Sequence, residues 1–399
     1  MLQFFSASTN IVNSKRAITE CIENALQGET DLNCDLIIIF SAIGHNFHDL
    51  LSEAHKLSPG ARITGCTGAG VIGKSGPDET MRALAIMVVK GPKNEFAIVH
   101  KENGKGINTF LTASEMAGEL KRMNADINMI LFLPDMIEWM PTDKGVEGIK
   151  SVFGQSMPVF GGVACDNVRG ISSFHFYDNE VVERGAVMVG FADPTLKVLS
   201  QATHGFNVIE EMTLEVTRAE PGCIYELNGR PAWTVFTETL GIPESSTWVE
   251  ALLVAGFARE LPVDLQKEYG NRYMLFGCLE KKEDRSIVTP VTCNEGLKLR
   301  LTKRNEKKMF DDVDLMMKKI VEKLEGKQPL AVFHVDCALR GRASLNRILK
   351  DEIINKIQYP LTKGKEIPWL GFYSAGEIAM LGGQSMVHNF SSALSIIYR

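Results

Sequence analysis

The sequence contains the short, uninterrupted apolar run Leu36-Ile-Ile-Ile-Phe40, which is typical of a strand buried on both faces of a sheet. Apolar residues recur at helical spacing over residues 47–57, which predicts a helix directly after this strand. Pro59 then leads into Ile63-Thr-Gly-Cys-Thr-Gly-Ala-Gly70. The whole stretch therefore predicts a βαβ unit whose second strand ends in a glycine-containing turn.

The same order of strand, helix, proline and glycine-containing turn occurs twice more. It runs from Met129-Ile-Leu-Phe-Leu133 to residues 158–166, and from Leu330-Ala-Val-Phe-His334 to residues 368–377. In open α/β sheets, ligands bind in the crevice at the carboxyl ends of the strands. Related units of this kind could therefore line one pocket with their turns. A single turn of this kind needs no ligand to explain it, because glycine is common wherever the chain bends tightly.

Strand and helix patterns alternate along the whole chain. This predicts an α/β protein made of two related units, each with a central mixed sheet covered by helices, packed into one compact body. The clearest helix is expected over residues 306–324, where apolar residues form one stripe. We place the domain boundary near residue 220, which gives domains 1–220 and 221–399. No Gly/Ser-rich or Pro-rich linker separates them.

The composition excludes several classes of protein. The 399 residues are 45% hydrophobic and 23% charged, with a net charge of −6, as in ordinary globular proteins. The basic residues are scattered, so no nucleic-acid partner is expected, and no apolar run approaches the roughly 20 residues that span a bilayer. The eight cysteines form no CxxC pair, which disfavours structural zinc and a disulfide framework. Reduced thiols and a cytoplasmic location are therefore expected.

One motif suggests a nucleotide site and is better explained otherwise. Residues 68–75 match the P-loop pattern GxxxxGK[ST]. A P-loop needs a helix that begins at its Lys-Ser pair, so that free N–H groups face the phosphates. Gly76-Pro77 follows at once, and residues 82–90 then have the pattern of a strand. We therefore expect no nucleotide here.

Thiol catalysis is the alternative from a different functional class. Cys66, Cys165 and Cys337 lie in or near the three turns, and His334 comes three residues before Cys337. A Cys–His pair could activate a thiolate. However, residues three apart on a regular strand point to opposite faces. A small-molecule enzyme with a cleft lined by Cys, Glu and Arg remains the second hypothesis.

Several short blocks of the sequence, in the same order, resemble the FIST proteins, whose FIST-N and FIST-C domains were named for intracellular signal transduction. These blocks are Gly65-Cys-Thr-Gly-Ala-Gly70, Phe160-Gly-Gly-Val-Ala-Cys-Asp166, Gly185-Ala-Val-Met-Val-Gly-Phe191, Tyr225-Glu-Leu-Asn-Gly-Arg-Pro-Ala232, Cys337-Ala-Leu-Arg-Gly341, Gly371-Phe-Tyr-Ser-Ala-Gly-Glu377 and His388-Asn-Phe-Ser-Ser-Ala-Leu394. Two positions depart from the family pattern: Leu339 replaces a glycine, and Gly70 stands where many relatives carry Glu.

The resemblance implies a cytoplasmic sensor that binds a small ligand such as an amino acid. Some stand-alone FIST members bind haem, sense nitric oxide and control a partner histidine kinase. The chain shows no recognisable kinase segment, so signalling through a separate protein is expected. The identity of the ligand, the output partner, the oligomeric state and the presence of any catalysis are left open by the sequence.

The predicted ligand site combines the turns with polar residues of the family blocks. Arg340 would bind a carboxylate and Glu377 would face an amine, unless these two side chains pair with each other. The predicted site residues are Gly65, Cys66, Thr67, Gly161, Gly162, Asp166, Arg340, Tyr373, Glu377 and His388.

A haem cofactor would need an axial ligand, which in a gas sensor is usually a histidine. His204 follows a strand-like segment and precedes a glycine and an aromatic residue, so it is the predicted iron ligand. His388 belongs to a block that haem-free FIST relatives share, and is less diagnostic. An ordinary strand-end histidine is the alternative for His204, because histidine is also a common structural residue.

Overall fold

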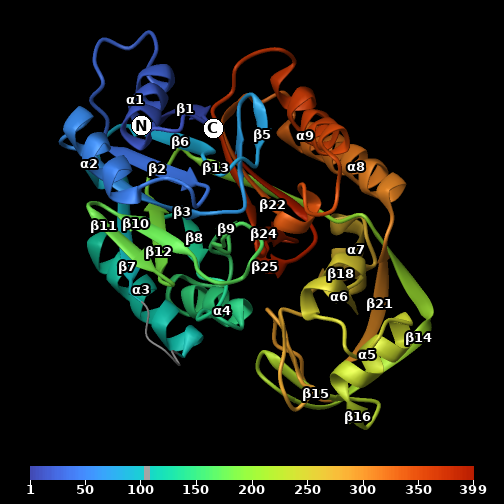
Figure 1. The fold of residues 1–399 in the computed structure, drawn as a ribbon. Helices are drawn as coiled ribbons and strands as arrows, with labels where there is room; N and C mark the ends of the chain where they lie inside the picture. The colour runs from blue at the N-terminus through green and yellow to red at the C-terminus, as the bar shows by residue number, and fades with distance from the viewer. Residues whose placement is uncertain (103–107) are drawn as a thin grey trace.

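The computed structural model describes residues 1–102 and 108–399, and within them three six-stranded sheets share one plan. Each sheet has a parallel strand pair at its centre, an antiparallel strand and an outer strand on one side, and a hairpin on the other. Helices cover the outer faces of these sheets (Figure 1). This confirms the predicted α/β class, with mixed sheets and helices in one compact body.

The first repeat supplies the parallel pair β2–β3, with helix α2 as the crossover. Its elements are β1 (Gln3–Thr9), α1 (Ser14–Ala25), β2 (Leu36–Ser41), α2 (Phe47–Leu57), β3 (Arg62–Thr67), β4 (Val71–Gly73), β5 (Gly76–Asp78) and β6 (Leu84–Lys90). Lys74 and Ser75 form the turn between β4 and β5. The prediction that residues 68–75 are not a P-loop is therefore confirmed, because no helix begins there.

The second repeat supplies the pair β8–β9, with α4 as the crossover. After the short 3-10 helix η1 (Lys93–Glu95), its elements are β7 (Phe96–Lys101), α3 (Thr109–Met123), β8 (Met129–Pro134), α4 (Thr142–Phe153), β9 (Val159–Gly162), β10 (Phe174–Tyr177), β11 (Glu180–Glu183) and β12 (Ala186–Phe191). Its order of elements from β7 to β12 is the same as that from β1 to β6.

The third repeat supplies the pair β22–β23, with α9 as the crossover. Its elements are β13 (Lys197–Thr203), α8 (Glu306–Leu324), β22 (Pro329–Cys337), the 3-10 turn η2 (Ala338–Arg340), α9 (Arg347–Thr362), β23 (Trp369–Ser374), β24 (Glu377–Leu381), β25 (Gln384–His388) and β26 (Ser392–Tyr398). Helix α8 has the predicted bounds, because its apolar stripe packs on the sheet and Asn305 caps its first turn.

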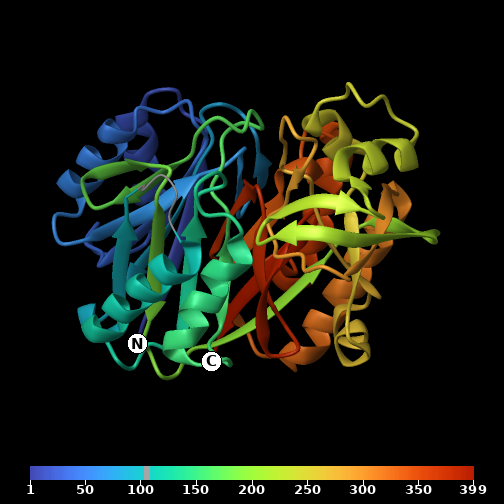
Figure 2. The same cartoon turned by 90° about the horizontal axis from the view of Figure 1, so that it is seen from below.

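A large insertion separates β13 from α8 in this third repeat. It contains β14 (Phe206–Glu220), β15 (Cys223–Leu227), β16 (Arg230–Pro231), α5 (Ala232–Leu240), α6 (Trp248–Val254), β17 (Phe257–Glu260), α7 (Val263–Tyr269), β18 (Tyr273–Phe276), β19 (Glu280–Lys281), β20 (Ile287–Val288) and β21 (Lys298–Arg304). Its strands form a sheet of their own, which lies to one side of the repeats in Figure 2. Residue 220, the predicted domain boundary, ends β14 and lies inside this insertion.

The three repeats exchange their hairpins in a ring. Hairpin β4–β5 joins the sheet of the third repeat, β10–β11 joins that of the first, and β24–β25 joins that of the second. Two of the three sheets therefore combine strands from both sides of residue 220. The chain must cross between sheets directly after β3, β9 and β23, which brings these three strand ends to one place.

The inner faces of the three sheets share one apolar core. Phe40 and Phe372 have ring centroids 4.4 Å apart, and Phe160 and Phe333 have centroids 5.3 Å apart, although each pair comes from two different sheets. This shared core explains why the central strands are apolar runs without alternation. No helix in the described residues is both long and apolar enough to cross a membrane.

Candidate functional site

The three turns meet through main-chain hydrogen bonds. The Ala69 amide donates to Tyr373 O over 2.9 Å, and the Cys165 amide donates to Thr67 O over 3.1 Å. The Ala375 amide closes the ring by donating to Val163 O, also over 3.1 Å. The ends of β3, β9 and β23 thus form one backbone framework, although the turn after β3 does not itself line the adjoining pocket.

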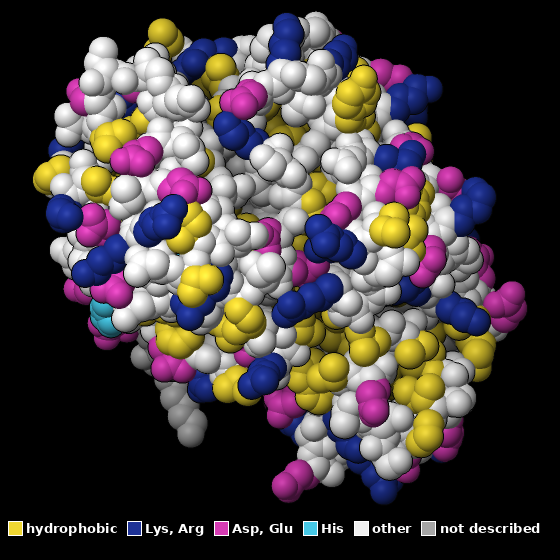
Figure 3. All heavy atoms as spheres, turned by 45° about the horizontal axis from the view of Figure 1, so that its top comes forward, with side chains coloured by type: hydrophobic (Ala, Val, Ile, Leu, Met, Phe, Trp, Pro, Cys, Tyr) yellow, Lys and Arg dark blue, Asp and Glu magenta, His cyan; other side chains and the backbone are white. Residues whose placement is uncertain are grey.

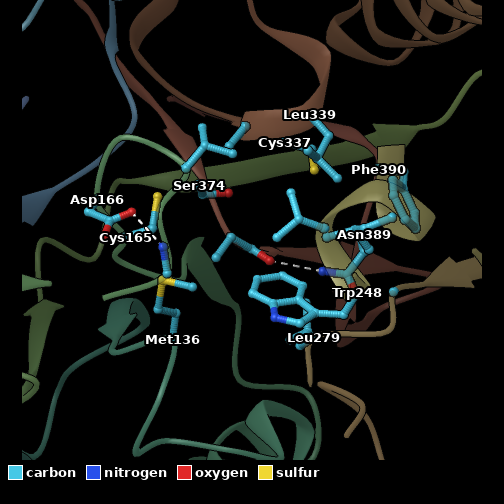
Figure 4. Close-up of a pocket in the computed structure, with 17 residues that line it drawn as sticks. Met136, Cys165, Asp166, Trp248, Leu279, Cys337, Leu339, Ser374, Asn389 and Phe390 are labelled. Carbon is cyan, nitrogen blue, oxygen red and sulfur yellow. Dashed lines mark hydrogen bonds between the residues drawn. The ribbon is translucent and has the colours of Figure 1, made fainter. Parts of the chain in front are cut away.

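A pocket of about 60 Å3 lies between this framework and the insertion (Figure 4). Because one water needs about 10–15 Å3, the pocket holds only a small ligand. Its walls are mainly apolar, and they come from the repeats and from α6 and the segment after β18. The lining residues are Met136, Cys165, Asp166, Val168, Gly170, Trp248, Val249, Leu252, Gly277, Leu279, Cys337, Ala338, Leu339, Ser374, Ala375, Asn389 and Phe390.

Hydrophobic side chains also gather on the surface of this part of the molecule. In Figure 3 they appear in yellow at the lower right, where Figure 1 places the insertion. In Figure 4, Met136 and Cys165 lie on one side of the pocket, and Leu339 and Phe390 on the other. Trp248 lies between them and is the one tryptophan that is not fully buried, since Trp139, Trp233 and Trp369 are at most 1% exposed.

Of the predicted site residues, Asp166 lines the pocket, but its carboxylate is already occupied. Its oxygens accept from the amides of Arg169, Gly170 and Ile171 at 2.7, 2.9 and 2.8 Å, and from the Ser172 amide at 3.4 Å. Asp166 therefore shapes the loop after β9, which forms one pocket wall. The carboxylate has little remaining capacity for a ligand.

Arg340 does not line the pocket, and its side chain pairs with Asp336 instead of Glu377. Its Nε donates to Asp336 Oδ1 over 2.7 Å, and both side chains are 1% exposed. Burial alone would raise the pKa of Asp336, but the charge of Arg340 and the hydrogen bonds around it hold that pKa below its ordinary value. The pair is therefore ionised at neutral pH.

Glu377 is fully buried and is held by two serines. Its Oε1 accepts from Ser374 Oγ over 3.1 Å, and its Oε2 accepts from Ser391 Oγ over 2.7 Å and from the Ser391 amide over 3.1 Å. Burial raises the pKa of Glu377 to about 8. The carboxyl group is thus largely protonated at neutral pH, and its expected role as an anionic partner for an amine is not favoured.

The raised pKa of Glu377 predicts a measurable pH dependence of stability. The folded state binds the proton up to about pH 8, whereas an unfolded chain releases it near pH 4.5. The contribution of Glu377 to the free energy of unfolding is therefore fully present below about pH 4.5. It falls by about 1 kcal/mol for each pH unit as the pH rises to about 8. Urea unfolding of Glu377→Gln between pH 5 and pH 8 should lack this decline. Parallel pH profiles of variant and wild type would contradict the assignment.

The remaining polar and glycine residues of the predicted site contact other parts of the chain. Gly65 and Gly161 contact the main chain of the neighbouring parallel strand, and a Cβ on Gly162 would lie 2.4 Å from Val335 Cγ1. The Thr67 hydroxyl accepts from the Phe174 amide over 3.0 Å. The Tyr373 ring is buried in a cluster with residues of α8 and α9 and does not line the pocket.

The three cysteines near the turns are all buried. Burial raises the pKa of the Cys66, Cys165 and Cys337 thiols, so thiolates are scarce at neutral pH. Cys165 and Cys337 do line the pocket, and the Cys165 thiol donates to Tyr373 O over 3.4 Å. They therefore behave as small apolar groups in the wall.

The surroundings of His204 do not fit a haem ligand. Its Nε2–H donates to Tyr273 O over 3.1 Å, and its Nδ1 accepts from the Phe206 amide over 3.2 Å. Both nitrogens that could bind iron are therefore engaged, and His204 does not line the pocket. Burial lowers the pKa of His388 to about 4, and this ring lies against Tyr269 with centroids 5.6 Å apart. The haem expectation stays a prediction that this geometry does not favour.

One group of potential metal ligands lies elsewhere among the described residues. Donor atoms of His100, Glu102 and Glu180 lie within 4.8 Å of one another. The two glutamates are exposed, and exposed acidic groups of this kind are common without an ion. This group does not adjoin the pocket.

The insertion contributes the pocket residues that the sequence patterns did not reveal. Trp248, Leu252, Gly277 and Leu279 lie outside the threefold repeat. The local signal nearest to them is the capping box formed by Thr247 and Glu250, which predicts where α6 begins but not what it faces.

Comparison with known proteins identifies the family. The FIST N domain matches residues 35–230 and the FIST C domain matches residues 232–380, so the chain belongs to the FIST family. FIST domains are small-ligand sensors, which agrees with the resemblance seen in the sequence.

Two similar relatives are an uncharacterized protein of Mycobacterium tuberculosis (strain ATCC 25618 / H37Rv) and one of Methanocaldococcus jannaschii. The first is 24% identical over 389 residues, with 96% of each chain covered; the second is 26% identical over 271 residues, covering 64% of this chain and 48% of the relative.

Among solved structures, a cyanuric acid hydrolase from A. caulinodans matches with a TM-score of 0.39 and 7% identity, over 100% of this chain and 99% of the other. A second cyanuric acid hydrolase structure matches with a TM-score of 0.35 and 8% identity, over 100% of both chains. Similarity this low says nothing about activity.

Proposed function

We propose that this protein is a cytoplasmic sensor whose pocket binds a small, largely apolar metabolite and passes the signal to a separate partner protein. The observation that carries the proposal is the position of the pocket, which lies where the insertion contacts the meeting point of the three repeats. A ligand there touches both parts, so binding would change how firmly α6 is held against the repeats.

Two further observations support parts of this proposal. The mainly apolar lining with a few polar groups, such as Ser374 and Asn389, is usual for small-molecule sites. All eight cysteines are unpaired and buried, as expected for a reducing cytoplasm. A histidine kinase as partner rests on analogy with other FIST members alone. No observation favours the enzyme alternative, because Arg340 and Glu377 do not share the pocket with the two thiols.

Trp248 provides the test of the proposed pocket. A metabolite collection should contain compounds that change Trp248 fluorescence and raise the melting temperature, because a ligand at 100 times its Kd adds about 2.7 kcal/mol of stability. Trp248→Phe should remove the fluorescence change while the melting shift remains.

A pocket-filling variant supplies the matched control. Ala338→Met places extra volume in the pocket wall and should abolish binding, whereas Ala125→Met makes the same change at an exposed loop position and should not. If no compound shifts the melting temperature, or if both variants bind equally well, the pocket is not the sensor site.

A further inference from the structure

Arg340 has two buried nitrogen atoms without a partner. Its Nε is occupied by Asp336, but Nη1 and Nη2 have no hydrogen-bond acceptor among the described residues, although the side chain is only 1% exposed. Buried polar groups are nearly always hydrogen-bonded, and a guanidinium can only donate. An acceptor from outside the chain, either water or a ligand, would complete the hydrogen bonding of this guanidinium.

Other groups around Arg340 also lack partners. The hydroxyl groups of Tyr269 and Tyr373 are buried and unpaired in the described part of the chain, and so are both ring nitrogens of His388. Burial raises the pKa of both tyrosines, and the nearby positive charge of Arg340 opposes part of that rise. The two phenol groups are thus neutral donors within the electrostatic reach of the guanidinium.

Most of the charges around Arg340 are paired within the chain. Lys308 pairs with Asp312 over 2.9 Å and Arg340 pairs with Asp336 over 2.7 Å, so these four charges cancel. Arg304, whose Nη2 donates to Leu339 O over 2.8 Å, has no carboxylate within salt-bridge distance among the described residues. Glu377 adds little negative charge at neutral pH, because it is largely protonated.

The segments that carry these groups also line the pocket. Cys337, Ala338 and Leu339 form the pocket wall directly before Arg340, and Asn389 and Phe390 do so directly after His388. The unpaired groups therefore lie behind the wall of an otherwise apolar pocket. Arg340 directly follows the wall residue Leu339, so a ligand in the pocket would reach the guanidinium only if Leu339 moved aside.

We propose that the ligand of this pocket is a small carboxylic acid, bound as its anion with both oxygens on Nη1 and Nη2 of Arg340. This inference rests on the proposed sensor function and names the class of its ligand. The planar fork of a guanidinium matches two carboxylate oxygens. The mainly apolar lining favours an acid with a short hydrocarbon part over inorganic phosphate, and the small pocket volume limits that part to a few carbon atoms.

Propionate, propionamide and inorganic phosphate are suitable probes, because the first two have the same shape and differ in charge. Propionate in the tens of millimolar should raise the melting temperature of the full-length protein, whereas propionamide and phosphate should not. Solutions matched in ionic strength with chloride remove general salt effects. If water alone occupies the site, propionate and propionamide act alike, and the inference is wrong.

A paired substitution tests Arg340 without leaving a lone buried charge. Asp336→Asn/Arg340→Gln removes both charges together, and its fold is checked by circular dichroism and a single unfolding transition. This variant should bind propionate at least 10-fold more weakly, as expected from the loss of charge-assisted hydrogen bonds. Unchanged propionate binding would overturn the role of Arg340. If neutral metabolites change Trp248 fluorescence but propionate does not bind, only this inference fails and the sensor pocket stands.

Discussion

Replacing Asp336 with alanine should lower the free energy of unfolding by about 3–5 kcal/mol, because it leaves the buried Arg340 without its counter-ion. Both side chains are 1% exposed and their charged atoms are 2.7 Å apart. The guanidinium would keep its charge in a site from which water is excluded, and it already lacks acceptors at Nη1 and Nη2. Urea unfolding followed by circular dichroism measures the loss.

An exposed ion pair with the same spacing in sequence gives the control. Lys307 and Asp311 also lie four residues apart, but their side chains are 84% and 58% exposed. Asp311→Ala should cost less than about 1 kcal/mol, because water solvates the remaining lysine. The neutral pair Asp336→Asn/Arg340→Gln should recover much of the stability lost in Asp336→Ala. Equal losses in Asp336→Ala and Asp311→Ala would contradict the account.

Local periodicity is the reason why much of this fold could be predicted from the sequence. The run Leu36–Phe40 is β2 because it is buried on both faces, and the stripe of residues 306–324 is α8 because it covers a sheet. The threefold pattern of strand, helix and glycine turn corresponds to the three parallel pairs. Each of these features is encoded within a few consecutive residues.

The exchange of hairpins could not be predicted in the same way. Nothing in residues 71–78 indicates that β4 pairs with β23, almost 300 positions later, instead of with a strand of its own repeat. Strand pairing depends on which sheet edge is free in the assembled protein, and side-chain preferences for one edge over another are weak. The sequence patterns thus predicted the α/β class and the threefold repeat, but not the strand pairing that interlocks the repeats.

The contacts of the predicted site residues could not be inferred from the sequence for a related reason. Asp166 and Arg340 have the expected residue types, but the chain itself occupies Asp166 with four backbone amides and Arg340 Nε with Asp336. Asp336 and Arg340 lie four residues apart in the sequence. This spacing is the local indication that their side chains could form an ion pair. The spacing alone does not distinguish it from an exposed pair.

Three glycines at equivalent positions should be the most sensitive places for added volume. Gly65 pairs with Ile39, Gly161 with Phe132 and Gly371 with His334, each across the central parallel pair of its repeat. A Cβ would lie 1.9, 2.2 and 2.3 Å from the main-chain oxygen of the respective partner. The contact is with backbone in the middle of a sheet, so neither atom can move without breaking the pairing.

Gly161→Ala should therefore cost about 3 kcal/mol or more, since steric overlap and a left-handed backbone each add about 1–3 kcal/mol. Two further variants separate these causes. Gly76 has a φ of +106°, and a Cβ there would meet no atom within 4 Å, so Gly76→Ala measures backbone strain alone. Gly371 is not in the left-handed region, so Gly371→Ala measures overlap alone. If Gly161→Ala lowers the free energy of unfolding no more than Gly76→Ala does, backbone strain and not contact with the neighbouring strand explains the need for glycine at position 161.

The same variants test whether the repeats unfold together. Because each sheet contains a hairpin from another repeat, weakening one parallel pair also weakens the two sheets linked to it. Gly65→Ala, Gly161→Ala and Gly371→Ala should therefore each lower the midpoint of a single transition that circular dichroism and the buried Trp139 and Trp369 report alike. Separate transitions, with one repeat lost before the others, would mean that the hairpin exchange does not couple the repeats energetically. Coincident transitions would mean that the pocket, built where all three strand ends meet, can exist only when the whole ring of repeats is folded.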